Sequence, residues 1–169
     1  MGIELVRIDD RLVHGQIVMA WCKAVPVERI VVIDEEAAQD ILRKMLLETT
    51  APPGIKVIVL PVSQGVEYLK KAALTGEKLL LLTAGPATVL TLAENDIHFN
   101  TVTIGGMSFG QDKIRVTQSV SISDMDRQAF KELHKRGIAL QIQILPHDAP
   151  VDFMPVLSGQ AEVKTIAAK

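Results

Sequence analysis

The stretch IELVRIDDRLVHGQIVMAWCKA, residues 3–24, contains the first strand, loop and helix that we expect in this chain. Residues 3–8 are mostly aliphatic and predict a strand, whereas residues 9–14 carry two acids, an arginine and a histidine and predict a loop. Residues 15–24 predict a helix, because Ile17, Val18 and Trp21 recur at the spacing of one helical face. A buried strand that leads through a charged loop into a helix is typical of α/β folds.

The same alternation of strands and helices continues along the rest of the chain. Near-continuous apolar runs predict strands at residues 29–33, 57–60, 79–82, 101–104 and 139–145. Amphipathic segments predict helices at residues 35–48 and 64–74, after Pro86, and between Ser123 and Gly137. Residues 113–122 predict one or two short strands, and residues from 146 onward predict a polar turn, a short apolar segment and a frayed tail.

Spacing and capping residues predict further details of the helices. The residues expected to face the core from segment 35–48 are Ala38, Ile41, Leu42 and Met45. Ser63 is expected to cap the helix at 64–74 and Gly76 to end it. Ser123 is expected to cap a helix whose apolar residues are Met125, Ala129, Phe130 and Leu133.

Together these elements predict one α/β domain over residues 1–169, a mostly parallel open β-sheet with helices on both faces and the active-site loop after strand one. In such folds, ligands bind beyond the carboxyl ends of the strands, near the point where the strand order reverses. We therefore expect the functional site in the loops at residues 9–16 and 105–112.

Composition excludes several other classes of protein. The net charge of −2 favours neither nucleic acid nor anionic lipid as a partner. Cys22 is the only cysteine, so we expect neither an internal disulfide nor a cysteine-based zinc site, and Cys22 is expected to be a packing residue. No export signal is visible, and the longest uncharged apolar stretch, residues 79–93, is shorter than the roughly 20 residues of a membrane span. We expect a cytoplasmic protein that inserts into no membrane and reaches one only through partners.

The loop at residues 9–14 brings a histidine to the start of a helix. An unperturbed imidazole has a pKa of about 6.5, so near pH 7 a ring nitrogen of His14 offers a lone pair as a nucleophile. The backbone N–H groups of Gly15, Gln16 and Ile17, with the helix dipole, would face a phosphoryl group bound there. Arg11 offers a planar set of donors to phosphate oxygens. On chemistry alone, the histidine is equally well interpreted as a helix cap or a surface residue.

Other residues of the predicted site also allow two interpretations. Asp9 and Asp10 either orient the imidazole or the neighbouring arginine, or interact only with the helix dipole. Gly105, Gly106 and Met107 either line the crevice of the phosphoryl group or form a plain turn after a strand. The chain has no Gly-x-x-x-x-Gly-Lys-Ser/Thr loop for ATP, which favours a protein as the phosphate donor. Neither a metal nor another cofactor is expected, because phosphoryl transfer to an imidazole needs positioning and charge stabilisation.

The segment RIDDRLVHGQ at residues 7–16, followed by Trp21, resembles the active-site segment of the enzyme IIB components of the mannose/fructose/sorbose family of the bacterial phosphotransferase system. The likeness extends over the whole chain. Gly105-Gly106-Met107 is similar to a glycine-rich segment of that family, and FKEL at residues 130–133 with Gly137 is similar to its late helix and turn.

This resemblance implies a protein-phosphohistidine–sugar phosphotransferase. His14 would receive phosphate from a phosphohistidine of the IIA component and pass it to a sugar bound by the membrane IIC/IID components. Arg11 would contact the phosphoryl group, and the resemblance suggests Nδ1 as the phosphorylated ring nitrogen. The identity of the sugar, the oligomeric state and the docking surfaces stay open.

Three other functions are possible for a chain with this pattern. A receiver-type signalling domain would need an acceptor aspartate after the third strand, where this chain has Pro61-Val62, and a lysine after the fifth strand, where it has Gly105-Gly106. A nucleotide-binding, other small-ligand-binding or purely regulatory module on the same scaffold would lack acid-labile, base-stable phosphorylation on His14. A IIB paralogue that serves regulation instead of transport would keep the same chemistry.

Overall fold

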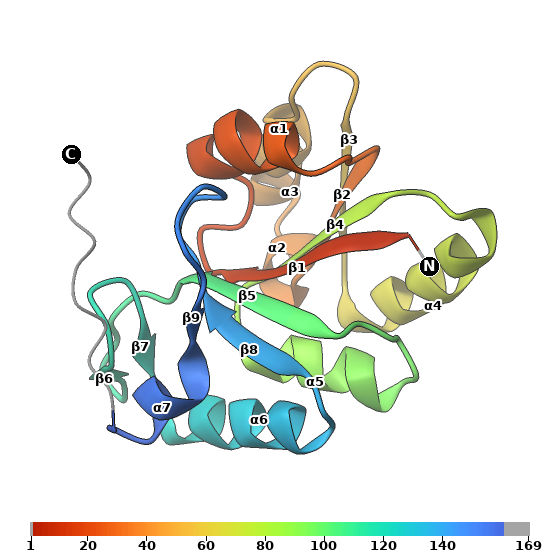
Figure 1. Ribbon diagram of the computed structural model, residues 1–169. Coiled ribbons are helices and arrows are strands. Elements are labelled where there is room, and N and C mark those ends of the chain that lie inside the picture. The colour runs from red at the N-terminus through yellow and green to blue at the C-terminus, as the bar shows by residue number, and fades with distance from the viewer. Residues whose placement is uncertain (1, 161–169) are drawn as a thin grey trace.

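The computed structural model describes residues 2–160 and has a seven-stranded sheet at its centre (Figure 1). The strand order is β3-β2-β4-β1-β5-β8-β9, and all neighbours pair in parallel except β8 and β9. The strands of this sheet are β1 (Ile3–Asp9), β2 (Arg29–Ile33), β3 (Lys56–Leu60), β4 (Leu79–Thr83), β5 (Thr101–Gly106), β8 (Ala139–Ile142) and β9 (Val151–Asp152). A small antiparallel hairpin consists of β6 (Ile114–Arg115) and β7 (Ser121–Ile122).

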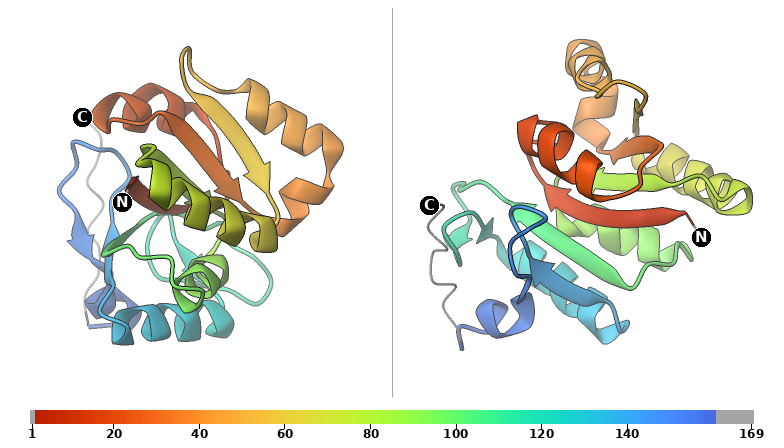
Figure 2. Two further views of the ribbon diagram at one scale, coloured as in Figure 1. Left: turned by 90° about the vertical axis from the view of Figure 1, so that its right-hand side faces the viewer. Right: turned by 45° about the horizontal axis from the view of Figure 1, so that its top comes forward.

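Helices cover both faces of the sheet (Figure 2). One face packs against a π-helical turn and three short helices, which are η1 (Ile17–Trp21), α1 (Cys22–Ala24), α2 (Glu35–Gln39) and α3 (Ile41–Thr49). The other face packs against α4 (Val62–Thr75), α5 (Pro86–Glu94), α6 (Asp124–Lys135) and α7 (Phe153–Leu157). Alternate residues of the strands enter the two cores: in β4, Leu79 and Leu81 face one, while Leu80 and Leu82 face the other. The predicted fold class is therefore confirmed.

The strand order reverses between β1 and β5. After β1 the chain continues to β2 on one side of the sheet, and after β5 it continues to β8 on the other side. The two strands lie next to each other, and the Asp10 N–H donates to the Gly106 carbonyl at 3.1 Å. The loops after β1 and β5 therefore meet at the switch point, as the sequence predicted.

The segment predicted as one helix at residues 35–48 is two helices with different faces, so that prediction is wrong. Asp40 adopts an extended conformation, and its carboxylate accepts hydrogen bonds from the N–H groups of Leu42 and Arg43 at the start of α3. The break changes the direction of the second helix, so Leu47 is its buried residue. The predicted core residues Ile41, Leu42 and Met45 are exposed, together with Leu46.

Three smaller predictions also differ from the structure. Helix α4 begins at Val62, before the predicted cap Ser63, and the Val62 N–H donates to a carboxylate oxygen of Glu35 at 3.1 Å. Met125 is exposed in the first turn of α6, whereas the other predicted core residues of that helix are buried. The last long strand ends at Ile142, because the next carbonyls bond to side chains of the site described below.

Other local predictions are confirmed. The capping box at Ser123 is present, Gly76 ends α4 with a φ of 71°, and residues 113–122 contain the two strands of the hairpin. Residues 15–24 are helical throughout, although their central turn is π-helical. The frayed tail was predicted at the end of the chain, where residues 161–169 lie outside the described residues. Across residues 2–160, every helix is too short or too polar to cross a lipid bilayer.

Candidate functional site

The loop after β1 is a tight turn built around Asp9, the last residue of the strand. The Asp9 carbonyl accepts a hydrogen bond from the Leu12 N–H at 2.9 Å, and its carboxylate accepts one from the Arg11 N–H at 3.3 Å. Leu12 adopts a left-handed conformation with a φ of 57°, which is unusual for a bulky residue, while its side chain is fully buried. This turn, strained at Leu12 but held by buried contacts, places His14 directly before Gly15, the first helical residue.

The carboxylate of Asp9 lies at the centre of the site and is fully buried. One oxygen, Oδ1, accepts from Arg11 Nε at 3.1 Å. The other, Oδ2, lies 3.2 Å from Arg11 Nη2, 3.0 Å from His14 Nε2 and 3.4 Å from Arg7 Nη2. One buried carboxylate therefore holds two guanidinium groups and the imidazole.

These contacts keep Asp9 ionised. Burial by itself raises the pKa of this carboxyl, but hydrogen bonds from His14 and Arg11, the charge of a protonated His14 and the charge of Arg7 outweigh burial and lower the pKa to about 2. The carboxylate is therefore an acceptor only at neutral pH.

The ionised carboxylate determines which nitrogen of His14 is free to react. Because Asp9 Oδ2 can only accept, the ring proton of the neutral imidazole sits on Nε2, and the lone pair is left on Nδ1. The Nδ1 atom faces the helix start, where the Gln16 N–H lies 3.4 Å away. The His14 side chain is 16% exposed, so the ring is mostly buried but still reaches solvent, and its Nε2 atom contacts the buried acid.

Arg11 is the more exposed of the two arginines in the site. Its side chain is 51% exposed although it forms a two-point contact with Asp9. Arg11 Nη2 also donates to Oε1 of Gln16 at 3.3 Å, in a solvent-facing contact. Arg11 and Gln16 therefore lie close to the imidazole, since Arg11 shares the Asp9 carboxylate with His14 and the Gln16 N–H donates to His14 Nδ1.

Arg7 is a residue of the site that sequence reasoning did not assign. Its guanidinium is fully buried, and Nη1 and Nη2 donate to the carbonyls of Gln143 at 2.7 Å and Ile144 at 3.2 Å. Burial lowers the pKa of Arg7 to about 10, against the opposing effect of the Asp9 charge, so the group is still a cation at neutral pH. An arginine inside a predicted buried strand was the available signal, because a buried charge needs a partner.

Trp21 and Gly105 enclose the Arg7 side chain. The guanidinium carbon lies 4.8 Å from the centroid of the Trp21 ring, whose N–H donates to the Ile144 carbonyl at 3.1 Å. Trp21 ends the π-helical turn, a feature often found at functional sites. A Cβ atom at Gly105 would overlap the Arg7 guanidinium, so this position requires a glycine. Gly105 therefore makes room for the Arg7 side chain.

The remaining predicted residues lie around this centre. The Asp10 carboxylate accepts from the Ser108 N–H at 2.6 Å, and within residues 2–160 it has no hydrogen bond to His14 or Arg11. Gly106 borders the site, since a Cβ there would lie 3.6 Å from Asp9 Oδ1. Met107 is buried and bridges to Val120, so its side chain does not line the site.

The helix start supplies backbone donors on the open side of the ring. The first helical hydrogen bond runs from the Val18 N–H to the His14 carbonyl at 3.1 Å, which leaves the N–H groups of Gly15, Gln16 and Ile17 ahead of the helical ladder. A Cβ atom at Gly15 would meet no atom within 4 Å, so the approach to this turn is open.

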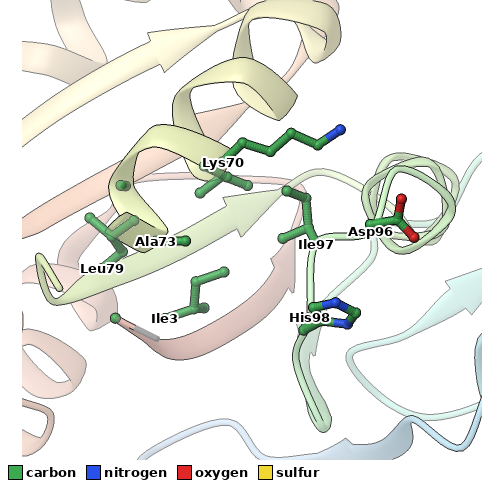
Figure 3. Close-up of a pocket in the computed structure, with 10 residues that line it drawn as sticks. Ile3, Lys70, Ala73, Leu79, Asp96, Ile97 and His98 are labelled. Carbon is green, nitrogen blue, oxygen red and sulfur yellow. The ribbon is translucent and has the colours of Figure 1, made fainter. Parts of the chain in front are cut away.

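Two other features carry no comparable chemistry. Burial raises the pKa of the Cys22 thiol to about 11, which favours the inert thiol and fits a packing role. An apolar pocket of about 160 Å³ lies at the opposite edge of the sheet, between α4 and the loop before β5 (Figure 3). Ile3, Leu79 and Ile97 line it, and the Lys70 side chain points away from it. Among the described residues, no group of His, Cys, Asp and Glu side chains is arranged to hold a metal ion.

The chain is thus an open α/β domain in which Arg7, Asp9, Arg11 and His14 form a site where the strand order reverses. Residues 3–167 match the family described as PTS system sorbose subfamily IIB component. The chain is 36% identical over 157 residues to the fructose-specific EIIB component of Bacillus subtilis, with 93% of this chain and 96% of that protein covered. The IIBSor domain of the Klebsiella pneumoniae sorbose permease superposes with a TM-score of 0.90 at 34% identity, with coverage of 95% and 99%. The chain belongs to this sorbose subfamily of phosphotransferase-system IIB components.

A further relative has a different length. The chain is 39% identical over 158 residues to the mannose-specific EIIAB component of Escherichia coli K12, with 94% of this chain covered. It spans only 49% of the length of that protein, about half.

Proposed function

We propose that the chain is a histidine phosphocarrier that receives a phosphoryl group on Nδ1 of His14 from a IIA component and transfers it to a sugar bound by membrane IIC/IID components. The observation that carries this proposal is the contact of 3.0 Å between His14 Nε2 and the buried Asp9 carboxylate. That contact leaves the Nδ1 lone pair at a helix start, next to a guanidinium. Residues 1–169 would act as one such domain, in the cytoplasm, and would reach the membrane through these partners.

The reaction can be written in two displacements. The Nδ1 lone pair of His14 attacks phosphorus, the phosphorus–nitrogen bond of the donor histidine breaks, and its electron pair returns to the donor ring. His14 keeps its proton on Nε2, and the positive charge that develops on the ring is stabilised by Asp9. In the second step a sugar hydroxyl attacks phosphorus, the electron pair of the bond to His14 returns to Nδ1, and the hydroxyl proton passes to a base outside this chain or to water.

The charges of the site favour a bound phosphoryl group. Arg7 and Arg11 carry two positive charges and Asp9 one negative charge, so these three side chains leave one net positive charge near the imidazole, while the Asp10 carboxylate accepts from the Ser108 N–H. The half-exposed Arg11 is the cation that can reach phosphoryl oxygens. The N–H groups at the helix start, of which that of Gln16 donates to Nδ1 of the unphosphorylated His14, add donors and the positive end of the helix dipole.

The test is to locate the phosphorylation. The protein is incubated with phosphoenolpyruvate, the general phosphotransferase proteins and a cognate IIA component, and the modified residue is identified by mass spectrometry. We expect one acid-labile phosphoryl group on His14 and none on a His14→Ala variant. His147→Ala is the matched control, because His147 also lies beside an aspartate, at 3.8 Å from Asp148, but is 76% exposed. Uptake of phosphate by the His14→Ala variant would contradict the proposal.

A further inference from the structure

We infer that Arg7 is the permanent counter-ion of Asp9, which frees Arg11 to leave that carboxylate and bind the phosphoryl group on His14. The inference rests on the proposed function. It assigns different roles to two arginines that contact the same carboxylate, and it makes Arg7 a positioning residue that never touches the phosphoryl group.

Arg7 is held by several buried contacts, although its Nε atom has no hydrogen-bond partner among the described residues. Two carbonyls of the segment after β8, those of Gln143 and Ile144, accept from its Nη1 and Nη2 atoms. The Trp21 ring covers it at 4.8 Å, and the missing side chain of Gly105 provides its space. Its Nη2 atom lies 3.4 Å from Asp9 Oδ2. Movement of this guanidinium would break several buried contacts at once, so it stays with the carboxylate.

Arg11 is held much less firmly. Apart from Asp9, its side chain has one hydrogen-bond partner among the described residues, the exposed amide oxygen of Gln16. Its side chain is 51% exposed, whereas that of Arg7 is fully buried. Rotation of the Arg11 side chain toward Nδ1 of His14 therefore breaks only contacts with Asp9 and with one flexible side chain.

The need for two cations follows from the burial of Asp9. A buried carboxylate that loses its partner is strongly destabilised, so a single arginine could not serve both Asp9 and the phosphoryl group. With Arg7 in place, Asp9 keeps one guanidinium and the His14 N–H after Arg11 has turned away. Without Arg7, the same carboxylate would retain Arg11 and compete with the phosphoryl group for it.

The inference is tested by the equilibrium partition of the phosphoryl group between phospho-IIA and this protein, measured with Arg7→Gln, Arg11→Gln and the double variant. We expect each single variant to lower the partition constant by about tenfold, an effect typical of a lost charge-assisted contact. In the Arg7→Gln background, removal of Arg11 should have little further effect, because Arg11 is already retained by Asp9. If Arg7 had a purely structural role, the decreases in the partition constant caused by the two single variants would multiply in the double variant.

Two further measurements keep the inference testable if Arg7→Gln does not fold. Arg7→Lys keeps a cation and should recover part of the partition constant. In the wild type, the side-chain N–H resonance of Arg11 should shift on phosphorylation, whereas that of Arg7 should stay. Arg29→Gln, at the opposite edge of the sheet, is the matched control and should leave the partition constant unchanged.

The outcomes separate this inference from the proposed function. If wild-type protein gains no phosphate on His14, the proposed function fails and the inference with it. If His14 is phosphorylated but the losses of the two arginines multiply, or the Arg7 resonance moves while that of Arg11 does not, the inference alone is overturned.

Discussion

The two edges of the sheet carry similar sets of residues with different consequences. At the carboxyl ends of the strands, Arg7 lies between Asp9 and the ring of Trp21. At the amino ends, Arg29 donates to Glu77 at 2.7 Å, and the Tyr68 hydroxyl donates to the same carboxylate at 3.0 Å. Each edge thus has an arginine, a carboxylate and an aromatic side chain.

Burial distinguishes the two sets. The Arg29 and Glu77 side chains are 26% and 23% exposed, so water screens their interaction, whereas Arg7 and Asp9 are fully buried. The amino-end set joins the start of β2 to the segment before β4, and an apolar pocket lies at this edge (Figure 3). The comparison predicts that only the buried pair, whose carboxylate contacts the His14 ring, affects the chemistry of that ring.

The strongest test of this comparison is Asp9→Asn. The amide keeps the shape but loses the charge, places an NH₂ group among donors and leaves Arg7 buried without its counter-ion. We expect phosphorylation of His14 to slow by about 100-fold or more. We also expect the free energy of unfolding to fall by about 3 kcal/mol. Single-turnover phosphorylation by phospho-IIA and urea unfolding measure the two effects, and a rate within about twofold of wild type would contradict this interpretation.

The second test fills the space beside Arg7. In Gly105→Ala the new methyl group overlaps the guanidinium, so either Arg7 or the strand must move. Overpacking of this kind is expected to lower the free energy of unfolding by about 2–3 kcal/mol and to slow phosphorylation. Gly110→Ala is the control, because a Cβ there lies 3.7 Å from its nearest neighbour, the Lys113 side chain. Equal stability of the two variants in urea unfolding would be evidence against a fixed Arg7.

The third test uses pH. The pKa of Asp9 is lowered to about 2, below the value of about 3.9 expected in the unfolded chain, so ionised Asp9 stabilises the fold above about pH 4. That contribution, about 2 kcal/mol, is lost as the pH falls from about 4 to about 2. The difference in free energy of unfolding between wild type and Asp9→Asn should therefore shrink over this range. A difference that stays constant would place the stabilisation elsewhere.

The sequence was sufficient for features that depend on neighbouring residues. The alternation of apolar runs predicted the parallel sheet, and the charged loop before Gly15 predicted where His14 would lie. Periodicity failed in segment 35–48, because Asp40 caps a new helix and turns Ile41 and Leu42 to the solvent. A residue with a free carboxylate in the middle of an amphipathic pattern was a signal for this break.

The part of the site that could not be predicted depends on distant residues. Arg7 is held by carbonyls 136 and 137 residues away in the chain, and nothing local to strand one indicates them. The different roles of Asp9 and Asp10 also depend on distant residues. Asp9 ends the strand and is buried, while the Asp10 carboxylate accepts from the Ser108 N–H in the loop after β5. Spacing alone treats these two acids as equivalent.

The smallest expected effect belongs to the other edge of the sheet and completes the comparison. Glu77→Gln removes a charge from a carboxylate that is screened by water; its amide oxygen can still accept from Arg29, while its NH₂ group can donate to the Tyr68 hydroxyl oxygen. We expect the free energy of unfolding to fall by at most about 1 kcal/mol and the rate of His14 phosphorylation to stay within about twofold of wild type. A large loss of phosphorylation in this variant would mean that the two edges are coupled through the sheet, and burial alone would then not explain why Asp9 controls His14.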